Sequence, residues 1–145
     1  MKLYLDACCF NRPADDLTQP RIYFEAEAIT AIVTYGEQGK WIIASSDVLD
    51  TELSRVSDVE KIVRIQTLYT KTHEKLRLTP AIEQRAVTFQ LRGVKLFHSL
   101  HLALAEQYGY DVLLTVDDQF LRAAQRTNPH IRVVNPLDWL MEISV

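Results

Sequence analysis

The chain has 145 residues, of which 48% are hydrophobic and 24% charged, a composition typical of one globular domain and unlike that of a disordered chain. The formal net charge is −3, so no global basic field indicates nucleic-acid binding, although a local basic rim around an acidic site would be hidden in that total. We treat residues 1–145 as a single domain.

The first half of the chain predicts two strands, a long helix and a short one. Within residues 2–7 the unbroken apolar run Leu3, Tyr4 and Leu5 predicts a strand buried on both faces, and residues 11–16 predict a loop. Residues 20–36 have the apolar spacing of an amphipathic helix. Residues 41–45 predict a second strand, and Ser46 is a candidate N-cap for a short helix after it.

Two further helices are predicted before residue 97. Ser57 and Glu60 have the spacing of a capping box, which predicts that Ser57 caps the helix behind it. One side of that helix carries four apolar residues, Val59, Ile62, Val63 and Tyr69. Residues 76–78 predict a short extended piece, and residues 79–91 predict a helix that begins at Thr79-Pro80.

The last third of the chain alternates between helices and strands. Residues 97–108 predict a buried helix that ends before Gly109, and residues 111–116 predict a strand. A helix, a strand at residues 131–134 and a final helical turn follow. This alternation predicts an α/β fold with right-handed crossovers and a mostly parallel sheet covered by helices on both sides.

The two cysteines, Cys8 and Cys9, are adjacent, which is a strained arrangement for a disulfide, and no Cys/His spacing indicates zinc. We expect reduced thiols that act as small core residues. The N-terminal apolar run is too short for a signal peptide, and no window approaches the length of a membrane span. We therefore expect a cytoplasmic protein that is not inserted in a membrane.

Acidic residues follow three of the predicted strands or begin the segments behind them. Asp6 ends the first strand, Glu52 lies just after the second, and Asp117 and Asp118 end the strand at residue 116. In parallel sheets these positions meet at one edge, where a cluster of carboxylates is tolerated when a divalent cation such as Mg²⁺ or Mn²⁺ neutralises it. The alternative is structural, because an Asp after a strand often caps a helix and a lone Glu is often solvated.

The same residues resemble a PIN domain, a small nuclease fold found in many prokaryotic toxins. The resemblance lies in five short motifs that occur in the family's order: MKLYLDACCFNRP (1–13), SSDVLDTEL (45–53), HSLHLALAE (98–106), LLTVDDQFLRAA (113–124) and VVNPLDWL (133–140). The resemblance implies a three-layer α/β/α sandwich with about five strands. It also implies Mg²⁺- or Mn²⁺-dependent endonucleolytic cleavage of RNA.

By this resemblance the catalytic, metal-binding acids are Asp6, Glu52 and Asp117, supported by Ser46 and Thr115. It further implies RNA as substrate, an antitoxin protein as a possible partner, and a homodimer. Covalent catalysis is not expected, because no Cys, Ser or Lys stands in a nucleophile arrangement.

One position departs from the family pattern. The family reads D-A-L-H-L-A where this chain reads H-S-L-H-L-A, so that His98 replaces the third acid. In one interpretation His98 is a neutral ligand and Mn²⁺ is favoured over Mg²⁺. In the other, the lost negative charge leaves a module that binds RNA or a partner protein without cleavage. Asp118 is a further candidate ligand or a helix cap, and His101 is expected to be structural.

Overall fold

The structure, a computed structural model, describes residues 1–144 and contains one parallel five-stranded sheet in that part of the chain. The strand order is β3-β2-β1-β4-β5, and the parallel sheet of five strands agrees with the predicted α/β fold. The strands are β1 (Lys2–Leu5), β2 (Ile42–Ser46), β3 (Glu74–Leu76), β4 (Val112–Leu114) and β5 (Arg132–Val134). The central strand β1 pairs on both sides, since Leu3 lies opposite Ile43 of β2 and Val112 of β4.

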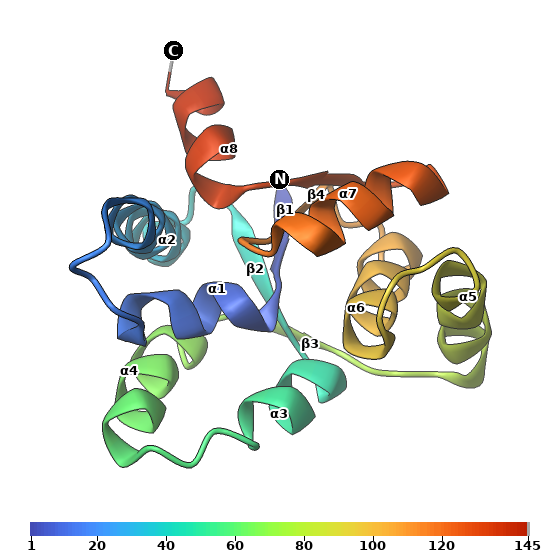
Figure 1. The fold of residues 1–145 in the computed structure, drawn as a ribbon, viewed down its shortest axis with the longest axis horizontal. Coiled ribbons are helices and arrows are strands. Elements are labelled where there is room, and N and C mark those ends of the chain that lie inside the picture. The colour runs from blue at the N-terminus through green and yellow to red at the C-terminus, as the bar shows by residue number, and fades with distance from the viewer. Residues whose placement is uncertain (145) are drawn as a thin grey trace.

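Helices cover both faces of this sheet (Figure 1). The helices are α1 (Ala7–Asn11), α2 (Pro20–Glu37), α3 (Asp47–Leu53), α4 (Val59–Tyr69), α5 (Pro80–Gln90), α6 (Leu96–Gln107), α7 (Asp118–Thr127) and α8 (Pro136–Ile143), with a 3-10 turn, η1 (Arg12–Ala14). In Figure 1, α1, α2 and α4 lie to the left of the sheet, and α5, α6 and α7 lie to the right. This is the α/β/α sandwich that the sequence predicts.

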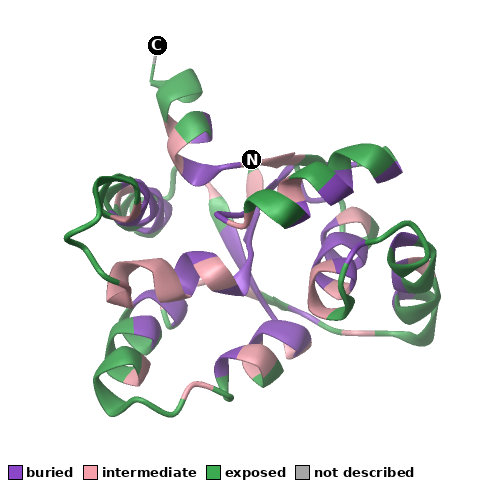
Figure 2. Ribbon diagram, in the orientation of Figure 1, coloured by how far each residue is buried: buried purple, intermediate pink, exposed green. Residues whose placement is uncertain are grey.

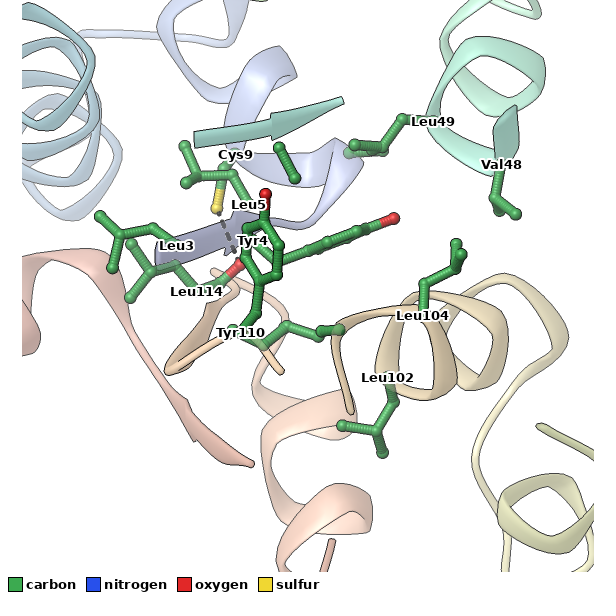
Figure 3. Close-up of a cluster of buried hydrophobic side chains, with 14 of the residues drawn as sticks. Leu3, Tyr4, Leu5, Cys9, Val48, Leu49, Leu102, Leu104, Tyr110 and Leu114 are labelled. Atoms are coloured by element: carbon green, nitrogen blue, oxygen red, sulfur yellow. Dashed lines mark hydrogen bonds between the residues drawn. The ribbon is translucent and has the colours of Figure 1, made fainter. Parts of the chain in front are cut away.

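The core surrounds the first strand. Leu3, Tyr4 and Leu5 are fully buried, which explains why the sequence of β1 is apolar without alternation. Figure 3 shows Leu3 and Leu5 beside Leu114 and Cys9, whose thiol donates to the Leu114 carbonyl at 3.4 Å. Figure 2 shows that the helices turn their buried sides towards the sheet and their exposed sides outward.

The predicted helix ends are largely confirmed. Ser46 caps α3 by accepting a hydrogen bond from the Leu49 amide at 3.0 Å, and Thr79 caps α5 in the same way. Gly109 follows α6 with a φ of +68°, a backbone conformation that glycine adopts without strain.

Two predictions about local structure are wrong. Residues 11–16 are not simply a loop, because α1 begins directly after Asp6 and η1 follows it. Asp6 itself caps α1, and the apolar residues behind it fold back onto the core. The loop prediction relied on Asn11, Pro13, Asp15 and Asp16, which lie at the end of α1, within η1 and directly after it.

The predicted cap of α4 is also wrong, and only one of the four apolar residues on the predicted side, Tyr69, is buried. Asp58, not Ser57, caps the helix by accepting from the Lys61 amide. Val59 is 73% exposed, whereas Ile65, Leu68 and Tyr69 are buried. The Tyr69 ring packs edge-on against Phe10 of α1 with centroids 5.2 Å apart, so the helix is rotated to turn that side inward.

One buried carboxylate ties several elements together. Glu25 of α2 is 1% exposed, and its oxygens lie 3.1 Å from Nε of Arg12 and 3.2 Å from Nε of Arg21. The Asn135 amide at the start of α8 donates to it at 2.6 Å. Arg21 also binds Asp118 with both terminal nitrogens, so this network joins η1, α2, α7 and α8.

Within residues 1–144, none of the helices has the length and apolar character required to span a bilayer.

Candidate metal centre

Asp6 is held rigidly at the carboxyl end of β1. It is fully buried, and its Oδ1 accepts from the Ala7 amide at 2.8 Å, which caps α1. Its Oδ2 accepts from the Thr115 hydroxyl at 2.9 Å and from the Cys8 thiol at 3.4 Å. These contacts fix the carboxylate at the sheet edge where the sequence predicts it.

Glu52 and His101 complete a cluster with Asp6. His101 of α6 donates from Nε2 to Glu52 Oε1 of α3 at 2.7 Å, and the same nitrogen lies 3.6 Å from Asp6 Oδ1. One ligand atom from each of the three residues lies within 4.8 Å of the others. His101 is fully buried, whereas Glu52 is partly exposed and faces the opening of the site.

A buried hydrogen-bond chain orients His101. The Tyr4 hydroxyl lies 2.5 Å from Nδ1 of His101 and 2.8 Å from the Ser46 hydroxyl. Burial is the main cause that raises the pKa of Tyr4 well above its ordinary value, so this hydroxyl keeps its proton. A partner on the second nitrogen is what orients the ring of metal-binding histidines. Ser46 lies at the end of this hydrogen-bond chain, and it also caps α3.

His98 lies between two carboxylates. Its Nδ1 is 3.1 Å from Asp6 Oδ2, at ion-pair distance but without hydrogen-bond alignment, and its Nε2 is 3.0 Å from Asp117 Oδ2. Its ring is stacked on Phe120 with centroids 4.2 Å apart. Burial alone would lower the pKa of His98, but contacts with Asp6 and Asp117 outweigh it and raise that pKa. When it is protonated, the imidazole is a counter-cation between the two acids.

The charge balance around Asp6 favours its ionised form. Burial opposes ionisation, but His98, the charge of His101 and the Thr115 hydroxyl together lower the pKa of Asp6 to about 2. The Cys8 thiol beside it stays protonated, because its contact with Cys9, together with burial, raises the pKa of Cys8 well above its ordinary value. Asp6 is consequently an anion throughout the physiological pH range.

We expect the metal-free protein to become less stable as the pH rises through the raised pKa of His98. A histidine whose pKa is higher in the folded state stabilises fully below its ordinary value of 6.5, and this contribution is lost as the pH rises. Asp6 behaves oppositely, contributing above 3.8 and losing its contribution as the pH falls towards about 2. Both residues therefore contribute fully to stability between pH 3.8 and pH 6.5, which are the ordinary pKa values of Asp6 and His98.

Urea unfolding in a chelator, from about pH 5 to about pH 8, measures this dependence. His98→Gln should flatten the loss of stability on the alkaline side, whereas His130→Gln, an exposed histidine, should leave it as in the wild type. Equal pH dependence in the wild type and in His98→Gln would contradict the assignment.

The two neighbouring aspartates after β4 have different surroundings. Asp117 caps α7 by accepting from the Phe120 amide at 3.1 Å, and its other oxygen faces His98. Asp118 points to Arg21, which donates to its two oxygens at 2.8 and 2.7 Å. The structure therefore places Asp117 beside the centre and Asp118 in the network of Glu25. Thr115 joins the two acids, since it donates to Asp6 and accepts from the Asp117 amide at 3.1 Å.

Sequence reasoning missed the contact that His101 makes. It treats this histidine as a packing residue within α6, yet its ring spans from Tyr4 to Glu52. A signal was available, because His98 and His101 are separated by three positions and so share a helix face that points to the same sheet edge. Cys8 was likewise expected in the core but is only half-buried beside Asp6.

The donor set of the cluster fits a divalent cation. Asp6 and Glu52 offer carboxylate oxygens and His101 offers an imidazole nitrogen, with one atom from each close enough to share an ion. Carboxylates suit Mg²⁺ and Mn²⁺, and an added imidazole is also compatible with other divalent transition ions such as Fe²⁺ or Zn²⁺. Two carboxylates also supply the negative charge that a buried cation requires.

Comparison of the sequence with models of protein families and with curated proteins found no match. Several solved structures share the fold, and two of them are FitAcB and VapBC2. The crystal structure of FitAcB from Neisseria gonorrhoeae is 16% identical, with a TM-score of 0.56, and the match covers 92% of this chain and 97% of that one. The second is the crystal structure of VapBC2 from Rickettsia felis bound to a DNA fragment from its promoter. It is 12% identical, with a TM-score of 0.62, and the match covers 93% of this chain and 98% of that one. At these identities the likeness speaks for the fold, and it confirms the PIN-like fold predicted from the motifs.

Proposed function

We propose that this chain, which has a PIN-like fold, is a divalent-metal-dependent endoribonuclease and the toxin of a toxin–antitoxin pair. One observation carries the proposal. Asp6, Glu52 and His101 come from three different elements, yet each presents a ligand atom within 4.8 Å of the others at the carboxyl edge of the sheet. Folding brings these groups together although burial and like charge oppose it, which is typical of functional sites.

Each residue has a distinct task in this proposal. Asp6, Glu52 and His101 would hold a Mg²⁺ or Mn²⁺ ion, with Asp117 beside them. Such an ion supplies activation of water and neutralisation of charge on a phosphodiester. Thr115 holds the Asp6 carboxylate, and Tyr4, itself held by Ser46, holds the His101 ring. Glu52 and Asp117 remain partly exposed, and so they face the side from which a substrate enters.

A second candidate function is favoured by His98. Its ring already bridges Asp6 and Asp117 at 3.1 and 3.0 Å, and in its protonated form it provides the positive charge that a cation would bring. A centre neutralised in this way has less need of a metal. In this candidate the chain is a PIN-like module that binds RNA or a partner protein without cleaving RNA.

One assay separates the two candidates. Purified protein is incubated with single-stranded RNA and Mg²⁺ or Mn²⁺, and with a chelator in parallel. Cleavage by the wild type that the chelator stops, and that Glu52→Gln lacks, would support the nuclease. Glu52 suits this control because its side chain is partly exposed and the Gln oxygen can still accept from His101.

His98→Asp restores the acid that the motif predicts and decides between the remaining outcomes. Metal-dependent cleavage by His98→Asp alone would favour the impaired module. No cleavage by either protein, with both folded, would overturn the nuclease proposal.

The proposal extends to partners. A toxin with a PIN-like fold would act in the cytoplasm and be held inactive by an antitoxin protein, and the chain would form a homodimer. An exposed aromatic pair supports a protein-contact surface, since Tyr23 and Phe24 of α2 are 44% and 54% exposed. Their rings pack edge-on with centroids 5.5 Å apart.

A further inference from the structure

Beside the acids lies a pocket whose walls are basic. It has a volume of about 260 Å³, and both His98 and Asp117 are part of its lining. The segment before α6 contributes Lys95, and α7 contributes Arg122 and Arg126. The centre described above thus adjoins a cavity with three further cations.

A second pocket of about 370 Å³ is lined by neighbouring parts of the chain. Arg92 and Thr127 line the second pocket. Their neighbours in sequence, Gly93 and Arg126, line the first. Gly93 lies beside the guanidinium of Arg126, since a Cβ built on it would be 4.0 Å from Nη2 of Arg126. The two pockets therefore follow one another between the turn before α6 and the end of α7.

These four cations have no acidic partner. Among residues 1–144, no carboxylate oxygen lies within ion-pair distance of Arg92, Lys95, Arg122 or Arg126. The chain does not lack acids, since it has 19 Asp and Glu against 16 Lys and Arg. Most other cations are paired, as Arg85 is with Glu106. Unpaired like charges repel one another when they are gathered along two adjoining pockets, and an anionic ligand relieves that repulsion.

The shape of the pockets points to part of a longer chain rather than to an enclosed small molecule. Enclosed ligand sites usually measure about 300–1,000 Å³, and the first pocket is smaller, with the second lined by residues next to it in sequence. All four cations are exposed, so their side chains can reach phosphates spaced along a strand. Arginine binds phosphate oxygens with two parallel hydrogen bonds, and three of the four are arginines.

We propose that Lys95, Arg122 and Arg126, continued by Arg92, bind the backbone of single-stranded RNA and lead it past the acids. This inference rests on the proposed function for its choice of RNA. It concerns affinity and substrate path rather than cleavage, and so it can be tested separately.

The test is binding of a labelled short oligouridylate, measured by fluorescence anisotropy in a chelator so that no cleavage occurs. Arg122→Gln/Arg126→Gln should weaken binding at least about tenfold, uniformly across RNA sequences. The slope of log affinity against log salt should become shallower by about 1.4, since each phosphate contact on a single strand accounts for about 0.7. The matched control, Lys61→Gln/Arg64→Gln, removes two unpaired cations of α4 and should bind as the wild type does.

The possible outcomes are distinct. Equal loss in both double variants would mean that net charge alone matters, and it would overturn the inference, as would wild-type affinity in Arg122→Gln/Arg126→Gln. No binding by the wild type at low salt would also overturn it. If only Arg122→Gln/Arg126→Gln loses RNA binding and the wild type does not cleave RNA in Mn²⁺, the RNA path is supported and the nuclease proposal fails. Thermal unfolding of all variants checks that they are folded.

Discussion

In the Asp6→Asn variant we expect saturable Mn²⁺ binding to be lost and RNA cleavage to fall by more than about 100-fold. Substituting a residue that only supports a metal ligand costs about 10- to 100-fold, and Asp6 is placed to be a ligand itself. The fold should survive, because Asn is as good an N-cap as Asp and can still accept from the Ala7 amide. Calorimetric titration with Mn²⁺ measures the binding directly, independently of activity.

Asp58→Asn is the matched control for this variant. Asp58 also caps a helix, accepting from the Lys61 amide at 3.2 Å, but it lies on α4 away from the acids. It should bind Mn²⁺ and cleave RNA as the wild type does. Unchanged Mn²⁺ affinity in Asp6→Asn would show that the centre does not hold the ion through this carboxylate.

Glu25→Ala is expected to cost about 3–5 kcal/mol of unfolding free energy, the range for breaking a buried ion pair. The variant leaves the Arg12 guanidinium and the Asn135 amide facing a cavity. The value should be near the lower end, because Arg12 keeps Asp15 and Arg21 keeps Asp118. Urea unfolding at neutral pH measures the change.

Two further substitutions separate charge from packing at this position. Glu25→Gln keeps the volume and an acceptor for Asn135, so it should cost less than Glu25→Ala. Glu27→Ala removes an exposed glutamate of the same helix and should change stability by no more than about 0.5 kcal/mol. A cost below about 1 kcal/mol for Glu25→Ala would show that the network contributes little.

Patterns within single elements predicted most of the fold. The apolar run of β1, the caps at Ser46 and Thr79 and the stop at Gly109 are local signals, and the structure confirms them. The rotation of α4 was not predictable in this way. Its inward side is decided by Phe10, which the sequence places far away and which only tertiary packing brings to Tyr69.

The sequence predicted the candidate site to the extent that the ends of strands determine where the residues after them lie. Asp6, Glu52 and Asp117 lie at the expected edge, because parallel strands end there together. The partner of each side chain was not predictable. That His101 reaches Glu52, and that Arg21 binds Asp118, depends on side-chain directions set by the packing of α6 and α2.

The strand order has a consequence for how the chain is made. Asp6 and the residue that anchors it, Thr115, are 109 residues apart, because the first strand lies between β2 and the late strand β4. Ribosomes add about 5–20 residues per second, so roughly 5–20 s separate the synthesis of these two residues. Until then the nascent chain carries Asp6 and Glu52 without β4, α7 or Asp117. Its centre is therefore one of the last parts of the molecule to be assembled during translation.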